Sequence, residues 1–395
     1  MVGGAGPLEP GTVAHALEAV LDLAALSGGL AFEEWVARAG ASPSWLRRMR
    51  DLSAPPACVE AFRRFGQAGG QVYGLAEGWC GDCAQVVPAL ARVCQQAGVS
   101  LRLFRRDADP GLREAHLTGG RAKIPLVVAV QPDPVRPGKL QEVGRFVERP
   151  ALANARLREG DPTAYSGPQV TQALWGELVD LVDGRGEPWE VASPGGPIRA
   201  HLHLPRGVRP RACVVTAHGA SYDQSHPLSR HFCQRLAQRG VAAVRFDFRF
   251  RTQSVPPSPD ASAEAEQLQA VARAAMERLQ LPPQALVLAG KSIGAVAAWR
   301  AAHELPVAAV VAFGPALHPP NRPGPGAEQL LAGLATPVLW FAARRDPYAE
   351  PSRVEQAFRS LPPGGQLVWL EDDHSLAASL QAVLDMAVSW VLQRT

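Results

Sequence analysis

The stretch "LAGKSIGAVAA" (288–298) carries a serine, Ser292, between two glycines. Apolar residues typical of a buried strand precede the serine, and a run of helix-forming residues follows it. The pattern G-x-S-x-G at a sharp turn from strand to helix is typical of a serine that acts as a nucleophile. The glycines suit such a turn, because a side chain there would meet the neighbouring strand or helix. The rest of the chain must then supply the partners of the serine.

Two partners follow in the order that this chemistry requires. Asp346 comes after the apolar stretch 337–343, and His374 comes after the apolar stretch 366–371. Both therefore lie beyond the carboxyl ends of expected strands, where parallel α/β sheets build their active sites. We expect His374 to take the proton of Ser292 and to return it to the leaving group, while Asp346 orients the imidazole.

Two neighbouring acids are alternatives for Asp346. Asp372 and Asp373 directly precede His374 in the chain, on the loop after the last expected strand. An acid that orients a histidine normally comes from a different loop, so we favour Asp346.

A tetrahedral oxyanion needs two backbone N–H donors. We expect the first from Ile293, directly after the nucleophile. The second is expected from Ala220 or Ser221 in the loop "AHGASYDQSHP" (217–227). His218 in the same loop is expected to have a structural role instead of acting as a second base.

Apolar stretches alternate with helical segments throughout the C-terminal half, which predicts a doubly wound, mostly parallel sheet. Strands are expected at 199–204, 211–217, 241–246, 285–290, 307–313, 336–342 and 366–370. With "AHGAS", "VRFDF", "GKSIG", "RRDPY" and "DDHS", residues 187–395 resemble dienelactone-hydrolase-like α/β-hydrolases related to testis-expressed and chromatin-associated members. The resemblance implies hydrolysis of esters or thioesters. Only some twenty residues separate the strands expected at 307–313 and 336–342, so no large cap is expected there.

A second motif, "GLAEGWCGDC" (74–83), holds Cys80 and Cys83. The pair could belong to a structural zinc site, could be two inert thiols, or could be redox-active. Zinc needs four ligands and the surrounding sequence offers no second pair, so we expect no metal. A strand at 70–77 and a helix at 83–98 would place the pair at a helix N-terminus, which lowers the pKa of a thiol. The redox interpretation is therefore favoured, with Cys80 attacking and Cys83 resolving.

The segments "EGWCGDC" and "KIPLVV" resemble a thioredoxin over residues 15–183, and "RRDADP" and "GRFVERP" resemble a subfamily with a helical N-terminal extension. The resemblance implies that Pro125 is cis and packs against the cysteines. Two features depart from the family. Asp82 lies between the cysteines and should disfavour a thiolate, and the strand offers Tyr73 and Gly74 where thioredoxins bury an aspartate.

Two domains are expected: a thioredoxin-like domain over 1–183, a linker at 184–196 and an α/β-hydrolase domain over 187–395. Residues 12–70 are expected to be helical. Further elements of the first domain are expected at 100–107, 110–117, 124–130, 134–146 and 169–182.

The composition excludes several classes of partner. The net charge is +3 and no basic cluster is present, so we expect no nucleic-acid binding. There is no uninterrupted apolar run of about 18 residues, so we expect no membrane span. Six cysteines suit a reducing bacterial cytoplasm. The expected partners are a small acyl substrate and a protein thiol or disulfide, and the only expected redox group is a Cys80–Cys83 disulfide. Two alternatives remain: a scaffold that has lost both activities, or a redox protein whose second half binds the client.

Overall fold

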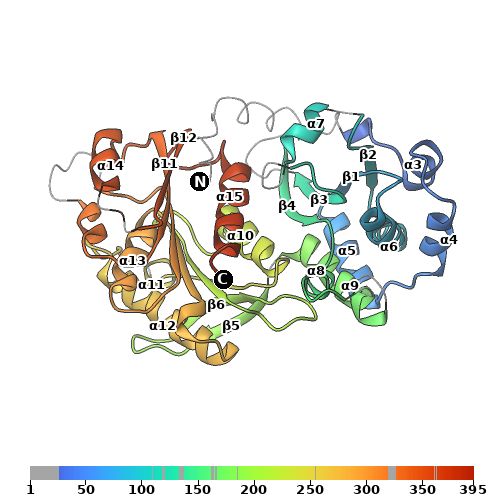
Figure 1. The fold of residues 1–395 in the computed structure, drawn as a ribbon. Coiled ribbons are helices and arrows are strands. Elements are labelled where there is room, and N and C mark those ends of the chain that lie inside the picture. The colour runs from blue at the N-terminus through green and yellow to red at the C-terminus, as the bar shows by residue number, and fades with distance from the viewer. Residues whose placement is uncertain are drawn as a thin grey trace.

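The computed structural model shows two α/β domains joined side by side (Figure 1). It describes residues 26–108, 110–117, 121–132, 138–161, 164, 167–184, 186–253, 255–318, 326–359, 361 and 363–395. The start of the expected helical stretch, 12–25, lies outside these residues. Within the described ranges, no helix is both long and apolar enough to cross a bilayer.

The N-terminal domain is built on a four-stranded sheet with the order β2-β1-β3-β4. Strands β1 and β2 are parallel, and β3 is antiparallel to both β1 and β4. Its elements are α3 (Phe32–Arg38), α4 (Ser44–Asp51), α5 (Pro56–Gln67), β1 (Gln71–Ala76), α6 (Gly81–Ala97), β2 (Leu101–Arg105), α7 (Pro110–Ala115), β3 (Leu126–Pro132), β4 (Leu140–Val147), α8 (Ala151–Arg158) and α9 (Pro168–Asp183). Apolar side chains of α3, α4 and α6 pack in one core, and those of α5, α6 and α9 pack in another.

Helix α6 shows how local sequence sets these boundaries. Cys80 is its N-cap residue, and Gly98 ends it with φ at +71°, a left-handed conformation that glycine adopts without strain. The helix therefore begins at the cysteine motif and ends at the glycine that the sequence predicts as its end.

The C-terminal domain contains an eight-stranded sheet with the order β12-β11-β10-β9-β7-β8-β6-β5. The six strands from β12 to β8 in this order are parallel, and β6 and β5 continue the sheet in antiparallel fashion. The strands are β5 (Glu187–Val191), β6 (Ile198–His203), β7 (Cys213–Ala217), β8 (Ala242–Phe246), β9 (Leu286–Lys291), β10 (Ala309–Phe313), β11 (Val338–Arg345) and β12 (Gln366–Asp373). The mostly parallel, doubly wound sheet is thus confirmed.

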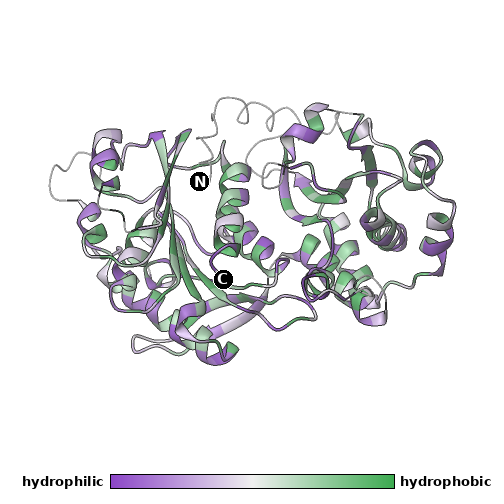
Figure 2. Ribbon diagram, viewed as in Figure 1, coloured by the Kyte–Doolittle hydropathy of each residue, from purple (hydrophilic) through white to green (hydrophobic). Residues whose placement is uncertain are grey.

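Helices cover both faces of this sheet. Those of the domain are α10 (Pro227–Ala237), α11 (Arg249–Thr252), α12 (Ser262–Leu279), α13 (Ile293–Ala302), α14 (Pro351–Phe358) and α15 (Leu380–Leu392). Apolar residues of α12 and α13 pack on one face, and those of α10 and α15 pack on the other. Hydrophobic residues accordingly concentrate in the strands and on the inner sides of the helices (Figure 2). The described residues between β10 and β11 hold one short 3-10 helix, Ala327–Leu331.

Two elements differ from the expectation. Strand β5 lies inside the segment predicted as a linker, where it pairs with β6 at the edge of the sheet. Gly184 and Gly186 precede it, and Pro194 and Gly195 follow it. Its side chains are mostly exposed, so it lacks the apolar pattern of a buried strand. Helix α8 was not predicted, because its alanines and arginines give little amphipathic signal.

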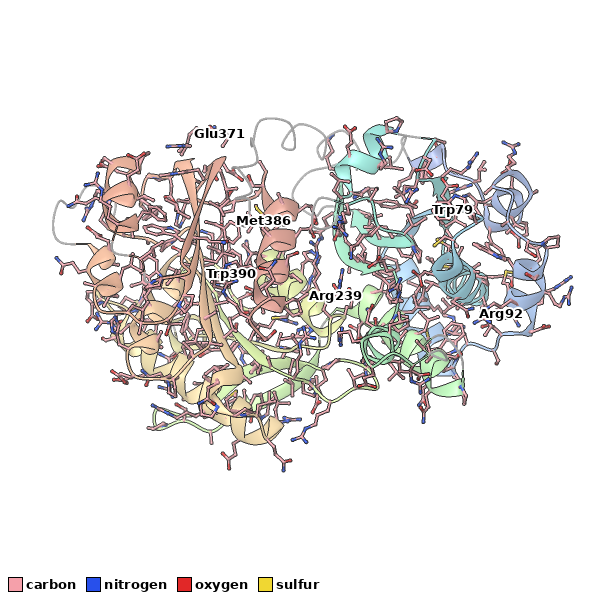
Figure 3. The ribbon with its side chains drawn as sticks, viewed as in Figure 1. Trp79, Arg92, Arg239, Glu371, Met386 and Trp390 are labelled. Carbon is pink, nitrogen blue, oxygen red and sulfur yellow. The ribbon has the colours of Figure 1, made fainter. Side chains whose placement is uncertain are left out.

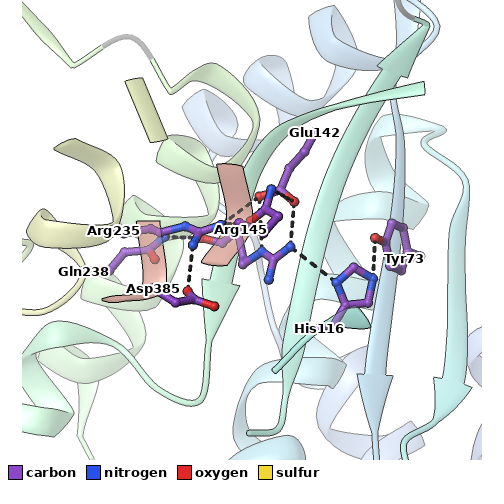
Figure 4. A network of polar contacts seen from close by, with 8 residues as sticks. Tyr73, His116, Glu142, Arg145, Arg235, Gln238 and Asp385 are labelled. Atoms are coloured by element: carbon purple, nitrogen blue, oxygen red, sulfur yellow. Dashed lines mark hydrogen bonds and ion pairs between the residues drawn. The ribbon is translucent and has the colours of Figure 1, made fainter. Parts of the chain in front are cut away.

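A buried polar network connects the two domains, and helices α10 and α15 face β4 across this contact (Figure 1). Glu142 on β4 accepts hydrogen bonds from Arg145 Nε at 3.1 Å and Arg145 Nη2 at 2.7 Å. Arg235 on α10 lies 3.5 Å from Glu142 and 2.7 Å from Asp385 on α15. Figure 4 shows that the network of polar contacts continues from Arg145 to His116 in the N-terminal domain. The domains therefore share buried charges.

Candidate active sites

Ser292 lies on the turn between β9 and α13, with φ +56° and ψ −119°. These angles are unusual for a residue with a side chain and are typical of a strained turn that exposes a nucleophile. The flanking glycines are required for steric reasons. A Cβ on Gly290 would lie 2.1 Å from the carbonyl oxygen of Gly294, and one on Gly294 would lie 2.6 Å from that of Ala217.

The three residues of the expected triad are in contact. The Oγ of Ser292 lies 2.9 Å from Nε2 of His374, and Nδ1 of His374 lies 2.8 Å from Oδ2 of Asp346. The other oxygen of Asp346 accepts the backbone N–H of Tyr348 at 2.8 Å. The Asp346 carboxylate is fully buried, while the His374 ring is 19% exposed. An imidazole held in this way can accept a proton from the serine.

The alternative acids serve other purposes. Asp372 accepts the backbone N–H groups of Asp373 and Ser379, each at 2.8 Å. Asp373 accepts the N–H and hydroxyl of Ser375. Both carboxylates therefore stabilise the turn that carries His374.

The loop after β7 lies against the serine. A Cβ on Gly219 would be 3.2 Å from Cβ of Ser292, and Ala220 and Ser221 follow on an exposed turn. On the other side, Ile293 is the first residue of α13, so its N–H lies at the helix N-terminus.

His218 joins this loop to the next one. Its Nδ1 donates to the carbonyl oxygen of Gly219 at 2.8 Å, and its Nε2 accepts the N–H of Phe248 at 3.0 Å. Burial lowers the pKa of His218, which keeps the ring neutral. With both nitrogens engaged by the backbone, His218 has the structural role expected for it.

The cysteines form a second site at the start of α6. The Cys83 backbone N–H donates to the Sγ of Cys80 at 3.4 Å, and the Cys80 thiol lies 3.8 Å from the carbonyl oxygen of Ile124. The Ile124–Pro125 peptide bond is cis. Cys80 is partly exposed, whereas Cys83 is buried, and both are free thiols.

The two thiols differ in acidity. Hydrogen bonding from the Cys83 side chain, helped by the backbone N–H groups of Cys83 and Asp82, lowers the pKa of Cys80 to about 6. Burial raises the pKa of Cys83 far above its ordinary value. The Asp82 carboxylate disfavours the Cys80 thiolate, as expected, but the hydrogen bonds to Cys80 outweigh the effect of Asp82. Its carboxylate makes two contacts with the Arg149 guanidinium, at 3.1 and 2.5 Å, which offset its charge.

Two neighbours of the thiols lie in the quoted motif but were given no role from the sequence. Glu77 ends the strand region before the motif and is fully buried, with the N–H of Asp107 donating to it at 3.0 Å. A carboxylate between an apolar strand and a C-x-x-C motif is a signal that could have been used. Trp79 directly precedes the N-cap residue of α6 and is 68% exposed (Figure 3). The Arg106 guanidinium lies 5.2 Å from the centre of the Trp79 ring.

No metal site competes with these interpretations in the part of the chain that the structure describes, since no group of three His, Cys, Asp or Glu side chains could hold an ion.

Sequence comparison identifies both domains. The model of a family described as "Alpha/beta hydrolase domain" matches residues 210–389, and that of a family described as "Thioredoxin" matches residues 29–160. The chain joins a thioredoxin-like domain to an α/β-hydrolase domain. No curated protein matches the sequence.

Several solved structures resemble the chain. An α/β serine hydrolase homologue from Coxiella burnetii is 20% identical, with a TM-score of 0.45 over 51% of this chain and 96% of that one. Dienelactone hydrolase from Anabaena variabilis is 24% identical, with a TM-score of 0.43 over 53% and 99% of the two chains. An α/β serine hydrolase without lid from Xanthomonas campestris is 21% identical, with a TM-score of 0.42 over 52% and 93%.

Proposed function

We propose that the α/β-hydrolase domain is a serine hydrolase of small carboxyl esters or thioesters. The observation that carries this proposal is the continuous chain of contacts from Ser292 Oγ through His374 to the buried Asp346. We also propose that this domain is related to dienelactone hydrolases and that the protein is cytoplasmic.

The reaction proceeds by acyl transfer. Ser292 Oγ attacks the carbonyl carbon as its proton passes to Nε2 of His374, and the carbonyl oxygen becomes an oxyanion held by the N–H groups of Ile293 and of Ala220 or Ser221. The carbon–oxygen or carbon–sulfur bond to the leaving group then breaks, and His374 protonates the alcohol or thiol. Water, deprotonated by His374, cleaves the acyl-serine and releases the carboxylic acid.

A fluorophosphonate probe tests this proposal, because it phosphonylates only an activated serine. We expect the wild-type protein to be labelled and Ser292→Ala to be unlabelled. Ser375→Ala is the matched control, since Ser375 is next to the histidine but contacts Asp373, and it should retain labelling. An unlabelled wild-type protein would favour the scaffold alternative, and labelling of Ser292→Ala would place the nucleophile elsewhere.

For the thioredoxin-like domain we propose thiol–disulfide exchange with a protein partner. The Cys80 thiolate attacks one sulfur of a client disulfide and releases the other as a thiol. Cys83 then attacks Cys80, which leaves a Cys80–Cys83 disulfide and a fully reduced client. The low pKa of Cys80 and the burial of Cys83 support this division of roles.

Alkylation by iodoacetamide tests the thiol proposal. The rate for Cys80 is expected to rise with pH through a midpoint near 6, because only the thiolate reacts and its pKa is about 6. Cys83→Ala removes a hydrogen-bond donor to Cys80 and should move the midpoint to higher pH. Cys80→Ser should abolish the fast phase, because the other cysteines are buried. A midpoint near that of an ordinary thiol, about 8.5, would contradict the prediction.

A further inference from the structure

Lys291 directly precedes the nucleophile, and its side chain is 1% exposed. It is one of only three lysines among forty cationic residues in the chain. Its Nζ has no hydrogen-bond partner. A buried ammonium is costly unless opposite charges lie near it, so the groups around it decide its state.

The groups around Lys291 come from three elements. Asp346 follows β11, Asp372 and Asp373 end β12, and all three favour the charged form of Lys291. His226, the N-cap residue of α10, also interacts with the lysine, and burial together with the Lys291 charge lowers the pKa of His226 to about 4. The neutral His226 leaves the carboxylates as the opposing charge.

Gly314 shows how close the lysine comes to the triad. A Cβ built on this glycine would lie 3.3 Å from Nζ of Lys291 and 3.6 Å from Oδ2 of Asp346. That same oxygen accepts the hydrogen bond from His374. No side chain separates the ammonium from the Asp346 carboxylate at this point, because residue 314 has none.

We infer that Lys291 is a positioning residue of the serine site, whose buried ammonium acts through Asp346 to set the basicity of His374. The inference rests on the proposed hydrolase function. A positive charge beside the Asp346–His374 pair disfavours the imidazolium form relative to the neutral ring that accepts the Ser292 proton. Loss of the charge lets the pair hold a proton more tightly.

Lys291 also loses its own proton within the pH range that can be measured. Burial lowers the pKa of Lys291 to about 8, against the opposing effect of the three carboxylates. Above that pH Lys291 loses its charge in the wild-type protein, so we expect the reactivity of Ser292 to rise a second time.

The test is the rate of inactivation by an uncharged fluorophosphonate between pH 5 and pH 10. Lys291→Met and Lys291→Gln keep the length of the side chain and remove its charge. Both should shift the acid limb of the profile upward by about one pH unit, which is a roughly tenfold lower rate at pH 6. Lys139→Met removes an exposed lysine and is the matched control, with no shift expected.

The outcomes distinguish the hydrolase proposal from the inference about Lys291. An unlabelled wild-type protein removes the hydrolase proposal and this inference with it. A labelled wild-type protein with unshifted profiles in both variants overturns the inference alone, since a lysine that only fills space would not move the acid limb. If neither variant folds, the wild-type profile decides: a second rise near pH 8 supports the inference, and a single-step profile overturns it.

Discussion

Asp346→Asn is expected to lower kcat for ester hydrolysis by about 10⁴-fold, while the fold is retained. Asparagine has nearly the shape of aspartate, and it can still accept the Tyr348 N–H that Asp346 accepts at 2.8 Å. Its amide, however, would donate toward Nδ1 of His374, where the carboxylate now accepts. The ring would then hold its proton on Nε2, the atom that faces Ser292, and could not take another.

The measurement is the steady-state rate with a chromogenic acetate ester, beside a circular dichroism spectrum that reports the fold. Asp372→Asn is the matched control, because this carboxylate is also buried but accepts only backbone N–H groups. It should lose less than about tenfold in kcat. Equal losses in the two variants would show that the change acts through the His374 turn and not through the tautomer.

The serine site could be expected from sequence because its chemistry imposes order. A nucleophile at a strand-to-helix turn needs glycines on both sides, and the partners must follow later strands of the same parallel sheet. Ser292, Asp346 and His374 therefore carry local signals, even though 82 residues separate the serine from the histidine.

Other features depend on contacts that no local pattern encodes. Arg149 pairs with Asp82 from a position 67 residues away, and no local pattern around the cysteines predicts this ion pair. Lys291 occupies an unspecified position of the G-x-S-x-G motif. Its charged neighbours come from β11, β12 and α10, which only the fold brings together around it. Strand β5 is similar, because pairing with β6 and not apolar content makes it a strand.

The interface between the domains is the clearest case of such long-range pairing. The Glu142 side chain is 4% exposed, and those of Arg145 and Arg235 are 1% and 7% exposed. Gln381 of α15 also donates to Glu142, at 3.2 Å, across 239 residues of chain. Nothing near Glu142 in the sequence distinguishes it from a solvated acid.

Glu142→Gln is expected to lower the free energy of unfolding by about 3 kcal/mol, because it leaves two buried guanidinium groups with Asp385 as the nearest remaining acid. Urea denaturation at pH 7, followed by circular dichroism, measures the difference. Glu60→Gln is the matched control: its ion pairs with Arg63 and Arg64 are exposed, and its loss should cost less than about 1 kcal/mol. Similar losses in the two variants would contradict the assignment.

The pH dependence gives an independent check on the same carboxylate. Burial alone would raise the pKa of Glu142, but Arg145 and Arg235 outweigh it and lower the pKa from 4.5 to about 2. A carboxylate with a lowered pKa in the folded state stabilises the protein above its unfolded pKa and loses this contribution as the pH falls. The difference between wild type and Glu142→Gln should therefore be constant above about pH 5 and shrink between pH 4.5 and pH 2. A difference that stays constant to pH 2 would mean that packing, and not the buried charge, holds the two domains together at this point.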